Sequence, residues 1–150
     1  MSLEEFWKVI EMSRATKSYD GQIESLTEIL EGMSDEKLTK FVECYDRARD
    51  AAFSYKLWFV AYIVNGGCSD DGFYNFLDWL IAKGQRAHHR VSRNPLWVLF
   101  YLYRRPPNGY ELEEFGQVPR DVYFDRFGRF AEYYALASTV NSPNEGQKNE

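Results

Sequence analysis

The sequence is poor in the features that mark secreted and membrane proteins. Its two cysteines, Cys44 and Cys68, are too few for a disulfide framework and form no CxxC pair. The first ten residues lack the basic and apolar regions of a secretory signal. The longest strongly apolar run, residues 57–64, is too short to cross a bilayer. We therefore expect a cytoplasmic protein that makes no contact with a membrane.

Acidic residues are missing from one stretch of an otherwise acidic chain. The 150 residues carry a formal net charge of −5 at pH 7. Residues 81–105 nevertheless contain six basic residues and no acidic one, between blocks of net charge −7 (1–80) and −4 (106–150). Such an asymmetry is the strongest functional signal in the sequence.

The sequence also lacks a cofactor motif, a catalytic set, an internal repeat and any convincing β-strand pattern. Aromatic residues are abundant instead, because Phe, Trp and Tyr make up 17% of the chain. Large rings fill the space between helices, and Tyr and Trp also suit binding surfaces. We expect no cofactor, and these features weigh against an enzyme.

Helical periodicity runs through the middle of the chain. The apolar spacing from Leu38 to Tyr62 predicts one helix over about residues 35–64, or two nearly collinear helices broken near Asp50. Polar positions nearly disappear after Leu57, which is typical of a buried helix. With the apolar stripe that follows the glycine-rich corner, this predicts a central buried helix pair formed by residues 57–64 and 73–81.

The C-terminal third has weaker patterns. Gly84 ends or bends the preceding helix, and Pro95 opens a short helix over residues 96–103. One helical turn is expected near residues 111–115, and Pro119 is expected to open the last helix. The fold class is therefore an all-α, single-domain bundle of about seven or eight helices over residues 1–137. Residues 138–150 lack a core-forming pattern and are predicted to be a disordered tail.

A family resemblance rests on short motifs in the first two thirds of the chain. They are Phe6-Trp7, Leu57-Trp58, the run from Gly66 to Phe73 (GGCSDDGF), Phe76, Trp79-Leu80-Ile81, Gly84 and Asn94-Pro95. Over about residues 3–100 this pattern resembles a family of small bacterial proteins known as a domain of unknown function, number forty-two forty. The resemblance implies a mostly helical, cytoplasmic bacterial domain, and it transfers no catalytic residue.

Three polar side chains recur on one face of the helix that follows the corner. Asp71, Asn75 and Asp78 are spaced four and then three residues apart and could offer oxygen ligands to a hard cation. A solvated face explains them better, because Ser69 caps the helix while Asp70 and Asp71 complement its dipole. We therefore expect no metal site, and Asp71, Asn75 and Asp78 are the candidates should one exist.

Thiol and imidazole groups also have structural explanations. A helix N-terminus would lower the pKa of the Cys68 thiol, but Asp70 and Asp71 act in the opposite direction. We therefore expect a buried, inert thiol. His88 and His89 are neighbours that diverge by about 100° on a helix, so they do not chelate one ion. A solvated pair is the expected arrangement.

The basic segment supplies the partner-binding candidates. The basic residues at 83, 86, 90 and 93 are spaced 3, 4 and 3 apart and are expected to line one helix face. With the downstream residues, the candidates are Lys83, Arg86, Arg90, Arg93, Trp97, Arg104 and Arg105. Such a stripe suits an internal ion-pair network, an acidic protein partner or nucleic acid.

Our leading hypothesis is a non-enzymatic protein-binding module, for instance an immunity- or antitoxin-like bacterial protein. The expected partner is another protein, and the oligomeric state is left open. The alternative is a nucleic-acid-associated or metal-dependent factor that uses an Asp70/Asp71/Asp78 face together with the basic stripe from Lys83 to Arg105.

Overall fold

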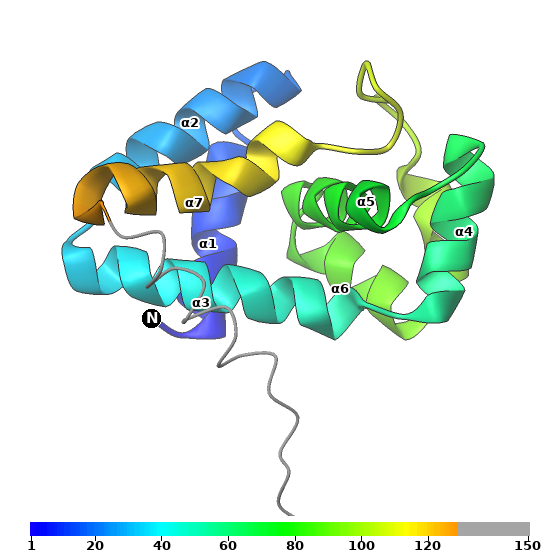
Figure 1. The fold of residues 1–150 in the computed structure, drawn as a ribbon, viewed down its shortest axis with the longest axis horizontal. Coiled ribbons are helices and arrows are strands. Elements are labelled where there is room, and N and C mark those ends of the chain that lie inside the picture. The colour runs from blue at the N-terminus through cyan, green and yellow to red at the C-terminus, as the bar shows by residue number, and fades with distance from the viewer. Residues whose placement is uncertain (129–150) are drawn as a thin grey trace, which may run out of the picture.

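The computed structural model describes residues 1–128. Over this range the chain forms seven α-helices, one 3₁₀ helix and no strand, which confirms the predicted all-α class. The elements are α1 (Leu3–Ser13), α2 (Tyr19–Glu31), α3 (Asp35–Ala52), α4 (Tyr55–Asn65), α5 (Asp70–Ala82), α6 (Gln85–Arg93), η1 (Pro95–Tyr101) and α7 (Glu113–Phe127) (Figure 1). The predicted tail, 138–150, lies outside the described residues.

Serine side chains begin the first five helices. Each accepts a hydrogen bond from the backbone N–H three residues further on, which satisfies one of the unpaired donors of the first turn. The capping residues are Ser2, Ser18, Ser34, Ser54 and Ser69. Ser2 and Glu5 bond reciprocally and form a capping box. The sequence therefore encodes these helix starts locally.

The helix α5 is the centre of the core. Nine of its thirteen residues are buried, and α3, α4, α6 and α7 all contact it. Phe73, Phe76 and Trp79 form a continuous row of ring contacts, with centroid distances of 6.2 and 5.2 Å. The predicted burial of residues 73–81 is confirmed for all but Tyr74 and Asn75, which are outside the buried set.

The predicted burial of residues 57–64 is wrong for most of α4. Only Leu57 and Ala61 are buried in this helix, whereas Phe59 is 66% exposed and Ile63 61% exposed. Trp58 holds the helix to the core, because its ring stacks on Phe73 at a centroid distance of 5.2 Å. An apolar helix therefore lies at the surface of the domain, attached along one narrow face.

The break between α3 and α4 falls at Phe53 and Ser54, three residues after Asp50. Phe53 has extended backbone angles and ends α3, while the Ser54 hydroxyl accepts a hydrogen bond from the Leu57 N–H and starts α4. The two helices are not collinear, because α4 runs across the end of α3 (Figure 1). This turn carries the apolar α4 away from the long axis of α3 to the edge of the domain.

The C-terminal third differs in detail from the prediction. The helix α7 begins at Glu113 and continues through Pro119, although proline removes one backbone hydrogen bond from a helix interior. Phe115, Val118 and Val122 are buried, and α2, α3 and α5 contact the helix, so packing offsets that loss. The segment after Pro95 is a 3₁₀ helix. Within residues 1–128, no helix combines the length and the hydropathy needed to span a membrane.

Candidate functional site

The structure divides the basic segment into two groups. Gly84 adopts a φ of 94°, a conformation that side-chain-bearing residues rarely adopt, and it separates α5 from α6. Lys83 therefore belongs to the end of α5, while Arg86, Arg90 and Arg93 lie on α6. The predicted single stripe is wrong for Lys83, because the glycine resets the helix direction between residues 83 and 86.

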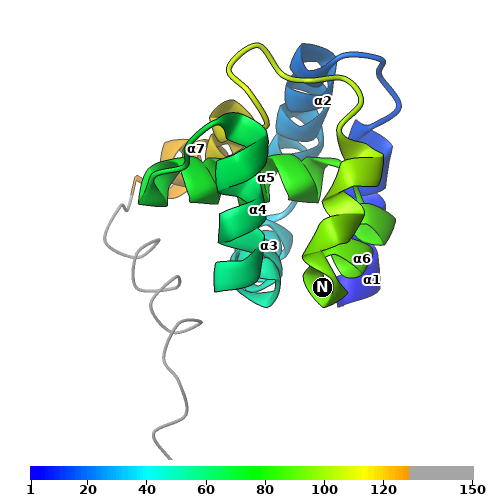
Figure 2. The same cartoon turned by 90° about the vertical axis from the view of Figure 1, so that its right-hand side faces the viewer.

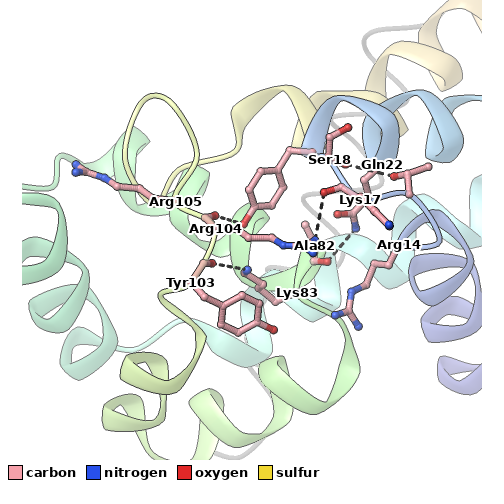
Figure 3. A pocket seen from close by; sticks show the side chains of 11 residues that line it. Arg14, Lys17, Ser18, Gln22, Ala82, Lys83, Tyr103, Arg104 and Arg105 are labelled. Atoms are coloured by element: carbon pink, nitrogen blue, oxygen red, sulfur yellow. Dashed lines mark hydrogen bonds between the residues drawn. The ribbon is translucent and has the colours of Figure 1, made fainter.

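The first group lines a basic pocket. This cavity of about 330 Å³ lies between the α1–α2 connection, the end of α5 and the segment that follows η1 (Figure 3). Its lining residues are Arg14, Thr16, Lys17, Ser18, Tyr19, Gln22, Ala82, Lys83, Tyr103, Arg104 and Arg105. Five of these eleven residues are basic and none is acidic, so the pocket has a positive potential.

Lys83 forms the inner wall of the basic pocket. Lys83 is only 7% exposed, and its Nζ donates a hydrogen bond of 3.1 Å to the Tyr103 carbonyl. The same ammonium lies 4.2 Å from the Tyr103 ring centroid and 5.5 Å from that of Tyr19. Burial, with smaller contributions from Arg14 and Arg104, lowers the pKa of Lys83 to about 8. The ammonium is thus desolvated and repelled by neighbouring cations.

Arg104 closes the pocket from the outer side. Its φ of 56° is the only positive value of a non-glycine residue among residues 1–128. The Tyr19 hydroxyl donates to the Arg104 carbonyl at 2.7 Å, and Arg104 Nη1 donates to the Lys17 carbonyl at 3.2 Å. These bonds hold the left-handed backbone and bring the guanidinium beside Lys17, whereas Arg105 points away from the cavity (Figure 3).

The cations of the basic pocket are poorly compensated. Arg14 forms an ion pair of 2.7 Å with Glu11. Within the described range, none of the other four basic residues of the pocket forms an ion pair with a carboxylate. The charge pattern of residues 81–105 indicates Lys83, Arg104 and Arg105, but it gives no sign of Arg14 and Lys17, which lie 66 residues or more before Lys83 in the chain. An internal ion-pair network therefore does not account for this group.

The second group borders an apolar surface, which we call the α4–η1 face. Eight large apolar side chains on these two helices are exposed: Tyr55, Phe59, Tyr62, Ile63, Leu96, Trp97, Leu99 and Phe100. The helices contact each other and lie side by side at one end of the molecule (Figure 2). Monomeric proteins rarely expose a contiguous apolar surface of this kind unless it binds something.

The 3₁₀ geometry of η1 explains how seven residues expose so much apolar surface. With three residues per turn, side chains three apart form ridges along the helix. Val98 is buried, while Leu96 and Leu99 form one exposed ridge and Trp97 and Phe100 another. Two of its three ridges therefore face outward.

Arg90 of α6 extends the α4–η1 face with positive charge. Its guanidinium carbon lies 5.0 Å from the Trp97 ring centroid, within the range of a cation–π interaction. Arg86 and Arg93 on the same helix are exposed, and neither forms an ion pair with residues 1–128. The helices α4 and η1 contain no acidic residue, so the face is apolar with a cationic border.

Asp78 is not part of a solvated face. Its side chain is buried in the core, where it accepts two 2.7 Å hydrogen bonds from Arg49 and a 2.9 Å bond from the Tyr45 hydroxyl. Burial raises the pKa of the Asp78 carboxyl, while Arg49 and Tyr45 favour its ionised form. This buried pair joins α3 to α5 and is structural.

The predicted acidic face (Asp70, Asp71 and Asp78) and the candidate metal ligands (Asp71, Asn75 and Asp78) therefore do not form exposed surfaces. Asp70 and Asp71 are exposed and Asn75 is half-buried, but Asp78, on the same helix face, is covered by α7. The cover is close, because a side chain at Gly116 of α7 would overlap the Asp78 carboxyl. Within residues 1–128, no group of three or more His, Cys, Asp or Glu side chains is placed to hold a metal ion.

Asp46 is a second buried carboxylate, and it is less well satisfied. One of its oxygens, Oδ2, is buried without a hydrogen-bond partner among the described residues. Burial, together with the nearby charges of Asp50 and Asp78, raises the pKa of Asp46 to about 6, against the opposing effect of Arg49. At neutral pH the ionised Asp46 carboxylate therefore destabilises the folded protein.

His88 and the two thiols have structural environments. His88 is buried, with its Nε2 2.7 Å from the Ala48 carbonyl oxygen and its ring centroid 4.9 Å from that of Trp7. The expected solvated pair is therefore wrong for His88, and only His89 is exposed. Burial raises the pKa of both cysteine thiols, and Glu111 adds to the effect at Cys68, which is half-buried. Raised pKa values disfavour the thiolate that a nucleophile needs.

The comparisons with known proteins place the chain in a family. A family model described as "Protein of unknown function (DUF4240)" matches residues 1–125. The chain belongs to this family. The match extends from the first residue into α7 and confirms the resemblance seen over about residues 3–100. No curated protein and no solved structure matches the chain.

The motif residues of the DUF4240 family have architectural roles in this chain. Gly66, with a φ of 69°, ends α4, and Ser69 caps α5. Trp79 is fully buried, and the Asn94 side chain caps η1 by accepting from the Leu96 N–H at 3.1 Å. The family pattern therefore describes the frame around α5, while the basic pocket and the α4–η1 face draw most of their residues from other positions.

Proposed function

We propose that this DUF4240 protein is a non-enzymatic protein-binding module whose α4–η1 face binds an acidic protein. The observation that carries the proposal is the exposure of eight large apolar side chains on two adjoining helices that contain no acidic residue. Exposed aromatic and aliphatic side chains provide the binding energy at the centre of protein interfaces.

The charge distribution indicates the chemistry of the partner. Arg90 on α6 lies over the Trp97 ring at the edge of the face, and Lys56 is exposed on α4. A partner surface with apolar side chains at its centre and carboxylates at its edge would match both features. Electrostatic complementarity of this type increases association rates and disfavours basic competitors.

A bacterial, cytoplasmic location is part of this proposal, as the family resemblance implies. The immunity- or antitoxin-like hypothesis is one form of it, in which the bound surface belongs to a toxin. The nucleic-acid or metal-dependent alternative has less support from the geometry, because Asp78 is buried and the basic residues from Lys83 to Arg105 do not share one face.

The test is partner capture followed by a binding measurement with matched variants. The full chain is used as bait in the native cell, captured proteins are identified by mass spectrometry, and each acidic candidate is purified and titrated calorimetrically. Phe59→Ser and Phe100→Ser remove exposed rings from the face, which are 66% and 70% exposed. Met12→Ser on α1, where the side chain is 60% exposed, is the control outside the face.

We expect Phe59→Ser with Phe100→Ser to weaken binding by about 30-fold or more, as for interface hot spots, and Met12→Ser to leave it unchanged. Arg90→Gln with Arg93→Gln should slow association and reduce its dependence on salt. Binding that persists in the double serine variant would overturn the proposal. So would sedimentation showing a homodimer that the same variant dissociates, because a second copy would then be the occupant.

A further inference from the structure

We propose that the basic pocket binds a small phosphate-bearing molecule. This site is separate from the α4–η1 face, and it is formed by the α1–α2 connection, the end of α5 and the segment after η1 (Figure 3). Its recognition elements are the cations of Lys17, Lys83 and Arg104, together with the ring of Tyr103.

The excess of positive charge is the first argument. Lys17, Lys83 and Arg104 line one cavity and have no carboxylate partner within residues 1–128. Holding several cations together without counter-charge is unfavourable, and the loss is relieved when an anion enters. A phosphate monoester carries nearly two negative charges at neutral pH, so it neutralises more of this excess than a single carboxylate does.

The donor geometry is the second argument. Lys83 uses one of its three N–H donors on the Tyr103 carbonyl. Arg104 uses one guanidinium nitrogen, Nη1, on the Lys17 carbonyl, which leaves other N–H groups of its planar fork for a ligand. Arginine and lysine donors of this kind are the usual phosphate ligands in proteins. Burial, with smaller contributions from the cations of Arg14 and Arg104, lowers the pKa of Lys83 to about 8, which agrees with this geometry.

The backbone of Arg104 is the third argument. Its left-handed conformation costs about 1 kcal/mol or more in a residue with a side chain. The Tyr19 hydroxyl, itself bonded by the Trp79 indole N–H at 3.2 Å, holds the Arg104 carbonyl. A chain of hydrogen bonds from the core thus fixes the backbone that directs this guanidinium beside Lys17, as expected for a preorganised ligand-binding residue.

The size of the pocket limits the ligand. A cavity of about 330 Å³ is near the lower end of the range for small-molecule sites. It accommodates a phosphate with a sugar or a small ring attached. The Tyr103 ring, which already faces the Lys83 ammonium, is 55% exposed and can contact such a group. Mononucleotides and sugar phosphates share this chemistry.

The experiment is calorimetric titration of the full chain at low salt with four probes: inorganic phosphate, ribose 5-phosphate, adenosine monophosphate and uncharged adenosine. We expect binding of the phosphate-bearing probes and none of adenosine. Organic phosphates that bind more tightly than inorganic phosphate would identify an esterified ligand, whereas equal affinities would identify the free anion. Either result supports a phosphate site.

Variants locate the site. Arg104→Gln and Lys17→Gln change exposed side chains and should each weaken phosphate binding about tenfold, the usual effect of losing one charged hydrogen bond. Lys83→Met should have an effect at least as large, and circular dichroism with thermal unfolding checks that it folds. Arg86→Gln, on α6 and outside the pocket, is the matched control and should bind as the unmodified chain does.

Three results would overturn the proposal. One is the absence of binding for every phosphate-bearing probe at millimolar concentration. Another is an equal loss of affinity in Arg86→Gln and Arg104→Gln, which would indicate a diffuse electrostatic effect. The third is tight binding of a short labelled RNA that requires both Arg86 and Arg104, because a nucleic-acid surface would then replace the small-molecule pocket.

Discussion

The helices α4 and α5 adjoin in sequence, and the more apolar of the two is the one at the surface. The helix α4 contains one charged residue, Lys56, yet only two of its eleven residues are buried. The helix α5 contains three aspartates and buries nine of thirteen residues. Hydrophobicity alone therefore does not decide which of two neighbouring helices occupies the core.

Partners elsewhere in the chain decide it. Asp78 of α5 is compatible with burial because Arg49 and Tyr45 of α3 supply three hydrogen bonds to its carboxylate. The outer side chains of α4, by contrast, are exposed, as Phe59 (66%) and Ile63 (61%) show. A charged side chain can lie in the core when hydrogen bonds satisfy it. Apolar side chains that no other part of the fold covers remain on the surface, where they can contact a partner.

Removing the carboxylate at the centre of α5 should produce the largest effect. Asp78→Ala leaves the Arg49 guanidinium, which is 23% exposed, without this counter-charge, and we expect a loss of about 3–5 kcal/mol in the free energy of unfolding. Urea denaturation followed by circular dichroism measures it. Asp71→Ala, in the exposed first turn of the same helix, should cost less than about 1 kcal/mol. Similar losses in both variants would show that burial of Asp78 does not matter.

Asp46→Asn sharpens the comparison, because Asp46 is a buried carboxylate with an unpaired oxygen. Its pKa of about 6 in the folded protein lies above the usual 3.8, so the folded state retains a proton that the unfolded state has released between these values. This contribution to stability therefore decreases as pH rises from about 4 to 6 and stays low above that. We expect Asp46→Asn to stabilise the protein by about 2 kcal/mol at pH 7.

The pH dependence of the stabilisation by Asp46→Asn shows whether ionisation of the buried Asp46 carboxyl causes it. The advantage of Asp46→Asn over the unmodified chain should shrink as the pH is lowered from 7 to 4, as measured by urea denaturation at each pH. Asp121→Asn on α7, where the side chain is 62% exposed, is the control and should change stability by less than about 0.5 kcal/mol. An advantage that stays constant with pH would mean that the Asp46 carboxyl does not titrate in this range.

The parts of the fold that could be predicted are those with local causes. Serine caps and apolar stripes fix the starts of α1, α2, α3 and α5 and the inner face of α5, and both signals lie within a few residues of the structure they produce. The direction of α4 depends on one turn at Phe53 and Ser54, and the continuity of α7 depends on packing around Pro119. The sequence near these positions does not exclude a straight helix over residues 35–64, nor a last helix that begins at Pro119.

In the candidate sites, too, only the features with local causes could be predicted from the sequence. The basic segment was recognisable from its composition, but Gly84 divides it, and the conformation of one glycine cannot be read from charge spacing. Arg14 and Lys17 join Lys83 and Arg104 only through the tertiary fold. Asp71 and Asp78 do share a helix face as their spacing requires, but α7 covers only the second, because Gly116 permits the close approach.

Removing an exposed ring of α4 should produce the smallest effect, and comparison with a buried side chain of the same helix tests the difference between its two sides. Phe59→Ala removes a large ring that is 66% exposed, and we expect the free energy of unfolding to change by less than about 0.5 kcal/mol. Leu57→Ala, two residues away on the buried side, should cost about 2–5 kcal/mol, since it leaves a cavity beneath the helix. Urea denaturation of the two variants gives the comparison. A loss above about 2 kcal/mol for Phe59→Ala would mean that the outer side of α4 is packed in the isolated chain, and the α4–η1 face would then not be free to bind a partner.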